Sequence, residues 1–341
     1  MGDTEWVKRG IQSIRDLLDS EYAVVHAELE AKLAEGYFHE SRRNIHPHNL
    51  TTALRHLSSS GLIHRDEKTT RGGRSIATIQ PTWMRRSRTK IDRASRRKRL
   101  LYSRYESWAG GSKRHPRGLI GPAGEASARL GALESRVFIP SEPNNGEVSH
   151  LLGTRLSGPA DMGGFLVPIK DNLPLPPICV LAEVKNIRSW IYPSSAELFQ
   201  VLAKSAILQR EHPDHPMVPI LICRKAQYTT YFLAKSLGCF VIATESQSVG
   251  NVDETHLLEV RNELGFGDLV HGSPPSRIVA RRLQQIGPSL PEFAQSWATA
   301  ASDDAVFQAI IGARSRDNRA RLRSVDRLRI LGKSRGWRTG W

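Results

Sequence analysis

The stretch ICVLAEVKN, residues 178–186, predicts a buried strand that ends in charged residues. Apolar side chains fill every position from 178 to 182, as in a central strand that is covered on both faces. Glu183 and Lys185 follow two positions apart, so the period of a strand places both charges on one face and Val184 on the other. The stretch therefore predicts a central strand that delivers a carboxylate and an ammonium group at the end of a sheet.

Apolar strands alternate with helices on both sides of this stretch, and this alternation indicates an α/β sheet with covered faces. The expected elements, in chain order, are a helix at 124–135, a strand–turn–strand at 149–169, the strand at 178–186, a helix at 194–210, a strand at 217–224, a helix at 227–238 and a strand at 239–245. Residues 251–341 are expected to be mostly helical. The predicted domain limits are 1–84, a basic helix and linker at 85–120, an α/β domain at 121–250 and a helical region with a basic tail at 251–341.

The N-terminal residues 7–84 predict three helices followed by a β-hairpin around Gly72-Gly73. This α+β order resembles the winged helix-turn-helix family, in which the third helix enters the major groove of DNA and the hairpin touches the backbone or minor groove. The resemblance nominates as DNA-binding residues Asn49, Thr51, Thr52, Arg55 and His56 on the third helix and Arg71 and Arg74 on the hairpin.

The positive charge of the chain is concentrated in two segments. Residues 85–117 carry 13 Lys or Arg against two acids, and residues 312–341 carry ten against two, whereas the whole chain has a net charge of +15. Segments of this kind suit phosphate backbones and predict a salt-dependent affinity for nucleic acid. Within the first segment the candidate DNA contacts are Arg96, Arg97, Lys98 and Arg99.

Several classes of protein are not indicated. No apolar run approaches the roughly 18 residues that span a bilayer, and the N-terminus lacks the apolar centre of a signal peptide. The sequence has no phosphate-binding loop of the G-x-x-x-x-G-K-[ST] type, so no nucleotide cofactor is expected. Cys179, Cys223 and Cys239 lie in apolar contexts without a C-x-x-C pair, which favours buried thiols in a reducing compartment. We therefore expect a cytoplasmic protein without a membrane anchor.

The tripeptide acid-x-Lys occurs three times in the sequence, and only its structural context can indicate a functional site. It occurs at Glu30–Lys32 in an expected helix, at Asp66–Lys68 in a polar stretch before the hairpin, and at Glu183–Lys185 at the end of a buried strand. Side chains two apart do not face each other on a helix. The third occurrence is therefore the only one of the three that predicts a shared site.

The order of elements around Glu183 resembles the PD-(D/E)XK nuclease superfamily, the restriction-endonuclease-like fold. The resemblance covers roughly residues 121–245 and implies a mixed-sheet core flanked by helices. It rests on Glu125 in the first helix, Asp161 in Pro-Ala-Asp, Glu183 and Lys185 in the strand, and Gln200 in the next helix. These five residues are the catalytic candidates. The rival for the metal-binding aspartate is Asp171, whose neighbours Asn172 and Pro174 are typical of a turn.

The resemblance also implies a metal ion. In this family two carboxylates and a backbone carbonyl hold Mg²⁺ or Mn²⁺, which would assign Asp161, Glu183 and the carbonyl of Val184 as ligands. Both ions prefer oxygen ligands and retain several waters. The ion lowers the pKa of a bound water and stabilises developing charge, while Lys185 orients or deprotonates that water. A salt bridge at the sheet rim is the alternative interpretation of Glu183 and Lys185.

These patterns predict a metal-dependent DNA endonuclease acting on double-stranded DNA, with a role in restriction or defence, recombination or mobile-element maintenance. A homodimer that cuts both strands is an option the sequence leaves open. Two other hypotheses stay open as well. One is a non-catalytic DNA-binding regulator or replication or partition factor on a nuclease-like scaffold, and the other is an assembly factor that recruits a protein partner through its N-terminal domain.

Overall fold

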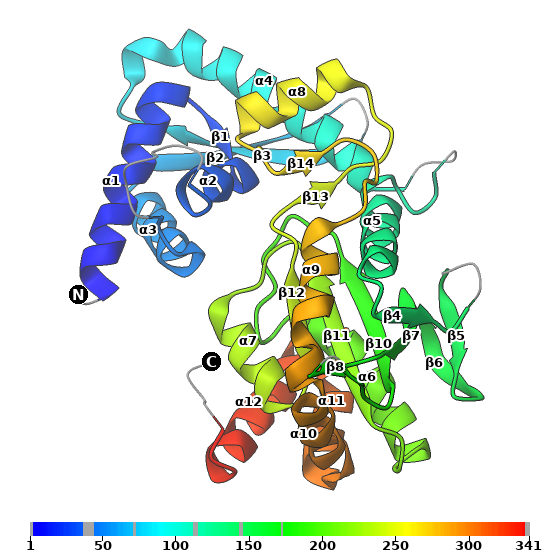
Figure 1. Ribbon diagram of the computed structural model, residues 1–341. Coiled ribbons are helices and arrows are strands. Elements are labelled where there is room, and N and C mark those ends of the chain that lie inside the picture. Colours follow the sequence, from blue (N-terminus) through cyan, green and yellow to red (C-terminus); the bar gives the residue numbers. More distant parts are fainter. Residues whose placement is uncertain are drawn as a thin grey trace. The chain divides into compact units, whose positions relative to one another are not determined.

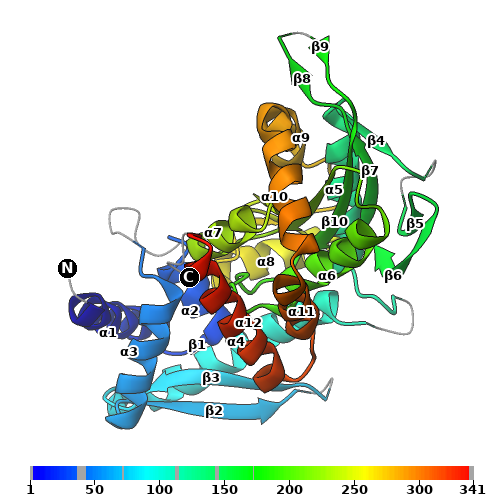
Figure 2. The same cartoon turned by 90° about the horizontal axis from the view of Figure 1, so that it is seen from below.

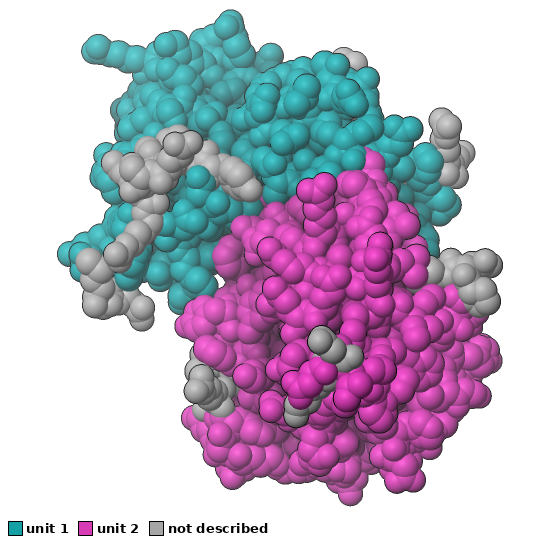
Figure 3. All heavy atoms as spheres, in the orientation of Figure 1, with its two compact units in different colours: residues 1–119, 249–271 teal, residues 120–248, 272–341 magenta. Residues whose placement is uncertain are grey.

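The computed structural model describes residues 3–36, 44–70, 73–111, 115–142, 146–171 and 173–337. They form two compact units, unit 1 from residues 1–119 and 249–271 and unit 2 from residues 120–248 and 272–341 (Figure 3). This division differs from the predicted domain limits at three places. The basic segment after residue 84 belongs to unit 1, the chain returns to unit 1 for residues 249–271, and residues 272–341 belong to the same unit as the α/β sheet.

Unit 1 is built from helices around a small antiparallel sheet of order β1-β3-β2 (Figure 1). Its elements are α1 (Asp3–Glu21), β1 (Val24–Val25), α2 (His26–Leu33), α3 (Pro47–Ser59), β2 (Ile63–Thr69), β3 (Ser75–Pro81), the short 3₁₀ helix η1 (Arg85–Ser87), α4 (Arg88–Ala109), α8 (Glu254–Leu264) and β14 (Leu269–Val270). The three helices and the hairpin follow the prediction, except that Val24 and Val25 form a strand before the second helix. β-branched side chains favour this extended conformation.

The core of unit 1 forms because its helices place apolar residues at helical spacing. Leu17 on α1, Leu29 on α2, and Leu50 and Leu57 on α3 are fully or almost fully buried together with Ile79 of β3. Polar residues occupy the outer faces of these helices. The result is an amphipathic arrangement around one core, as the periodicity predicts.

Unit 2 is an α/β unit around a five-stranded mixed sheet of order β12-β11-β10-β7-β4. The sheet elements are β4 (Phe138–Pro140), β7 (Met162–Leu166), β10 (Ile178–Lys185), β11 (Met217–Cys223) and β12 (Phe240–Ala243). β10, β11 and β12 are parallel to one another, and β7 is antiparallel to both β10 and β4. The α/β class and the mixed sheet are therefore as predicted.

Two small hairpins and one further strand accompany the sheet. They are β5 (Val148–Leu151) with β6 (Thr154–Ala160), β8 (Ile169–Lys170) with β9 (Leu173–Pro174), and β13 (Gln247–Ser248). The predicted strand–turn–strand at 149–169 is thus three strands, β5, β6 and β7. The β8–β9 hairpin extends past the end of the sheet (Figure 2) and accounts for much of the 22-residue interval between Asp161 and Glu183.

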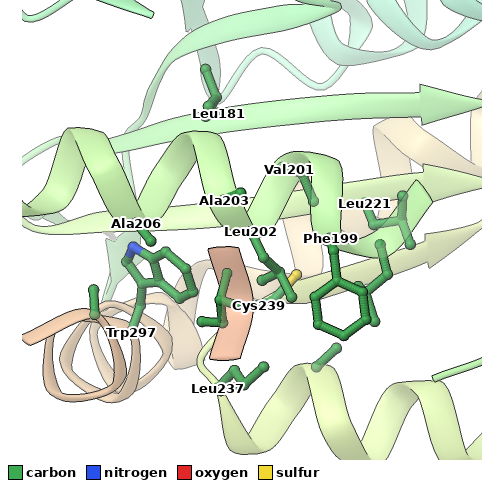
Figure 4. Close-up of a cluster of buried hydrophobic side chains, with 14 of the residues drawn as sticks. Leu181, Phe199, Val201, Leu202, Ala203, Ala206, Leu221, Leu237, Cys239 and Trp297 are labelled. Atoms are coloured by element: carbon green, nitrogen blue, oxygen red, sulfur yellow. The ribbon is translucent and has the colours of Figure 1, made fainter. Parts of the chain in front are cut away.

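Helices cover both faces of this sheet. They are α5 (Ile120–Glu134), α6 (Ala196–Glu211), α7 (Tyr228–Ser236), α9 (Arg277–Ile286), the 3₁₀ helix η2 (Gly287–Ser289), α10 (Leu290–Ser302), α11 (Asp304–Ala313) and α12 (Asn318–Ser334). Val180 and Ala182 of β10 pack with α5 and α9, whereas Leu181 packs with α6 on the other face. Figure 4 shows that second face, where Phe199 and Leu202 of α6 and Trp297 of α10 lie among the buried side chains. Among the described residues, no helix has the length and apolar character needed to cross a membrane.

Candidate active site

The end of β10 places Glu183 and Lys185 on the face of the sheet that α6 covers. Alternation along the strand directs Val184 to the α5–α9 face, where it joins the apolar cluster of that side. Lys185 Nζ donates a hydrogen bond to Glu183 Oε2 at 2.9 Å. Glu183 is only 3 % exposed, so the pair is held largely out of water. The predicted one-face arrangement of the two charges is confirmed.

Asp161 is brought to Glu183 by the register of the antiparallel strands. β7 pairs with β10 so that Met162 lies opposite Ala182, and continuing this register by one residue sets Asp161 opposite Glu183. The Asp161 carboxylate accepts a 2.7 Å hydrogen bond from the backbone N–H of Val184. Asp171, the rival aspartate, is exposed in the β8–β9 turn with a φ of 51°. The preference for Asp161 over Asp171 is supported by this geometry.

A second lysine, Lys204 of α6, reaches the same glutamate. Its Nζ pairs with Glu183 Oε1 and also donates to the carbonyl of Pro159 at the end of β6. Each carboxylate oxygen of Glu183 therefore faces its own ammonium group. Sequence reasoning did not include Lys204, although it lies one helical turn after the predicted Gln200 and hence on the same side of the helix.

The surroundings shift the acidities of these groups in opposite directions. The pKa of Asp161 is raised to about 6, first by burial and then by the neighbouring carboxylates Glu183 and Glu125, and the Val184 N–H and Lys185 oppose this rise. Burial also acts to raise the pKa of Glu183, but Lys185 and Lys204 outweigh it, so that the pKa of Glu183 is lowered. Burial disfavours the charge of Lys185, yet Glu183 and Asp161 hold its pKa above the usual value. Neighbouring carboxylates with opposed pKa shifts are typical of functional sites.

A group of three carboxylates lies beside this pair. Glu125 of α5, Glu147 before β5, and Asp161 each offer an oxygen atom, and the three atoms lie within 4.8 Å of one another. Arg129 ties α5 to this place, since its Nη1 lies 3.2 Å from the carbonyl of Asp161 and 3.8 Å from Glu125 Oε2. Carboxylate oxygens are the ligands that Mg²⁺ and Mn²⁺ prefer. Burial and, after it, the neighbouring carboxylates raise the pKa of Asp161, and a bound cation would offset the charge of these carboxylates. The residues therefore fit a hard divalent ion.

The metal ligands suggested by the structure differ from those suggested by the sequence. Asp161 belongs to both sets of ligands. The structure adds Glu125 and Glu147 to the set, whereas both carboxylate oxygens of Glu183 already bind lysines. Val184 presents its N–H to Asp161. The sequence around Glu147 does not predict a metal ligand. Glu147 comes close to Asp161 because the β5–β6 hairpin pairs their neighbours, Val148 and Ala160. Gln200 is half-buried on α6, and no hydrogen bond of its side chain is found among the described residues.

The basic helix α4 uses much of its charge inside unit 1. Lys98 is 5 % exposed and donates to Glu28 Oε1 at 2.6 Å and Glu21 Oε2 at 2.9 Å. Arg99 is also buried and binds Asp66 Oδ2 at 2.5 Å. The expectation that Lys98 and Arg99 contact DNA is corrected by this burial, because their charged groups already have internal partners.

Arg97 and Arg96 on the same helix differ in accessibility. Arg97 is half-buried and pairs with Glu263 and Glu259 of α8, at 2.5 and 3.1 Å. Arg96 is exposed. Of the four basic residues predicted from α4, Arg96 alone is fully accessible to a partner.

The other predicted DNA contacts lie on α3 and at the hairpin. Thr51, Arg55 and His56 are exposed, and Asn49 and Thr52 are half-buried. The hydroxyls of Thr51 and Thr52 donate to carbonyls one turn back, of Pro47 and His48. Arg74 is half-buried, with its guanidinium against Gly110 at the end of α4. Arg71 lies outside the described residues.

Comparison of the chain with protein-family models, curated proteins and solved structures finds no match.

Proposed function

We propose that the protein is a Mg²⁺- or Mn²⁺-dependent endodeoxyribonuclease that hydrolyses phosphodiester bonds of double-stranded DNA. The observation that carries the proposal is the convergence of Asp161, Glu183 and Lys185 at the meeting point of β7 and β10. Phosphodiester hydrolysis needs an activated water, cations that offset phosphate charge, and stabilisation of the leaving oxygen. Carboxylates that hold a metal, placed next to a lysine, meet these needs.

The arrangement of unit 2 supports the resemblance to the PD-(D/E)XK superfamily. A helix with Glu125 precedes the strands, Asp161 stands before β7, Glu183 and Lys185 end β10, and α6 follows. β10 is antiparallel to β7 and parallel to β11, which gives the mixed sheet that the resemblance implies. Unit 1 likewise has the three helices and hairpin of a winged helix, which we propose as a DNA-positioning module.

Each residue has a separate task in this proposal. Glu125, Glu147 and Asp161 would hold the divalent ion, which when bound supplies Lewis-acid activation of water and phosphate. Glu183 holds Lys185 in place, and it would join the ligands only by giving up one of its two lysines. The raised pKa of Lys185 keeps it cationic at neutral pH, so it orients the attacking water and offsets phosphate charge rather than accepting a proton.

A plasmid-cleavage assay tests the proposal. Supercoiled DNA incubated with the protein and Mn²⁺ or Mg²⁺ is expected to be nicked or linearised, and EDTA is expected to prevent this. Glu183→Ala and Lys185→Ala are expected to abolish cutting while DNA binding persists. Binding without metal-dependent cutting by the wild-type protein would refute the nuclease and favour a DNA-binding regulator.

A further inference from the structure

The C-terminal helix α12 is strongly basic, and its cations have two kinds of environment. The helix holds six Lys or Arg and one acid. Arg321 faces inward and is engaged, since its Nε donates to Ser194 O at 3.1 Å and its Nη2 to Asn318 Oδ1 at 2.6 Å. Arg319, Arg323 and Arg327 are exposed, and their side chains make no hydrogen bond or ion pair among the described residues.

These three arginines form a stripe on the outer side of α12. They are spaced four residues apart and so lie along one side of the helix. The buried residues Val325 and Leu328 fix the opposite side against the core of unit 2. Gly312 lets α12 pack closely on α11, because a Cβ there would come within 2.5 Å of Ser324 Oγ. The outward direction of the stripe is therefore determined by packing.

Fold stability does not account for the stripe. Like charges four residues apart on a helix destabilise it by a few tenths of a kcal/mol per pair. Asp317 caps the helix by accepting from the backbone N–H groups of Arg319 and Ala320, so the N-terminal turn is stabilised without the arginine side chains. An uncompensated row of guanidinium groups is instead complementary to a regularly spaced polyanion.

The start of α12 is fixed beside the elements that form the candidate active site. Arg321 donates to the carbonyl of Ser194, two residues before α6, the helix that carries Lys204. Arg314, just before α12, donates to Ser157 of β6, the strand that leads to Asp161. The stripe therefore extends from a helix start that is anchored both to β6 and to the residues before α6 within unit 2.

We propose that Arg319, Arg323 and Arg327 of α12 form the surface on which unit 2 holds the phosphate backbone of its DNA substrate. This inference rests on the proposed function for the choice of partner. It assigns backbone binding in unit 2 to α12, whereas the charges of Lys98 and Arg99 on α4 serve the fold of unit 1. Contacts of this kind give affinity without sequence specificity.

Binding of a fluorescent DNA duplex of about 30 base pairs, measured by anisotropy in EDTA over a range of salt concentrations, tests the proposal without any cleavage. Each phosphate contact contributes about 0.9 to the slope of log K against log salt. Arg323→Gln with Arg327→Gln is therefore expected to reduce the slope by about two and the affinity by roughly 10- to 100-fold near 0.1 M salt. Arg323→Lys with Arg327→Lys is expected to retain most of the slope.

The matched control removes two other exposed arginines of unit 2, Arg136 and Arg281, which lie on the α5–α9 side. Arg136→Gln with Arg281→Gln changes the net charge equally and is expected to leave the slope unchanged. An equal loss in both double variants, an unchanged slope in the α12 variant, or no duplex binding by the wild type would overturn the proposal. The test is independent of catalysis. If Asp161→Asn no longer cuts DNA but binds it with the wild-type affinity and slope, the result bears on the proposed active site and not on the α12 stripe.

Discussion

Lys204 and Lys185 bind opposite oxygens of one carboxylate, Glu183, although they come from a helix and a strand. This arrangement keeps a buried glutamate ionised next to Asp161, where a single lysine would leave one oxygen without a cation. The two lysines have different expected roles. Lys185 lies at the sheet end beside Asp161, whereas Lys204 is anchored to the carbonyl of Pro159 and acts by positioning Glu183.

Replacing Lys204 is expected to slow cleavage without abolishing it. Lys204→Met should lower kcat about 10- to 100-fold with a small change in KM. A loss of this size is usual for a residue that orients an active-site side chain without contacting the substrate. Lys204→Arg should recover part of this loss. Lys185→Met, which removes the group beside the reacting water, should cost about 10²- to 10⁴-fold. Single-turnover rates give the comparison, and wild-type rates in Lys204→Met would contradict the positioning role.

Asp161→Asn is expected to stabilise the metal-free protein at neutral pH. The pKa of Asp161 in the folded protein is about 6, above its ordinary value of 3.8, so folding becomes less favourable as pH rises between these values. Removing the charge should raise the free energy of unfolding by up to about 3 kcal/mol above pH 6, and the gain should vanish below about pH 4. Denaturant unfolding of both proteins at pH 4.0 and 7.5 measures this, and a destabilised variant at pH 7.5 would contradict it.

Manganese is expected to stabilise the wild-type protein by binding to the three carboxylates. A saturating concentration should raise Tm, and the increase should be larger at pH 7.5 than at pH 5.5, because a proton on Asp161 competes with the metal ion. Glu147→Gln tests the ligand set directly, since Glu147 is exposed and its loss should not disturb the fold. If Glu147→Gln responds to Mn²⁺ as the wild type does, Glu147 is not a ligand.

Two neighbouring cations of α4 are expected to behave in opposite ways. Lys98→Ala should destabilise unit 1 by about 3 to 5 kcal/mol, because it removes a partner of the buried Glu28. Arg96→Ala should leave Tm unchanged and weaken duplex binding. Thermal unfolding and anisotropy on both variants separate the two roles, and the prediction fails if Lys98→Ala has a wild-type Tm.

Local patterns predicted the strand of Glu183 and the helix of Lys204, because burial and periodicity act over a few residues. The pairing of Asp161 with Glu183 was predicted only through the resemblance to a nuclease fold, because the residues between them include the exposed β8–β9 hairpin. The position of Glu147 was not, because the β5–β6 turn that brings it to Asp161 carries no charge pattern. The internal role of Lys98 was hidden for a similar reason, since its partner Glu28 lies 70 residues away in sequence. Contacts between distant segments depend on packing that periodicity does not describe.

The central claim, water attack on a phosphodiester at this site, is tested most directly by cleavage of duplex DNA with Mn²⁺ in ¹⁸O-enriched water. The account predicts products with 3′-hydroxyl and 5′-phosphate ends, with one solvent oxygen in each new 5′-phosphate. It also predicts that Asp161→Asn and Lys185→Met cut at least about 100-fold more slowly than the wild type. Cleavage at the wild-type rate in both variants, or products without solvent oxygen in the 5′-phosphate, would contradict it.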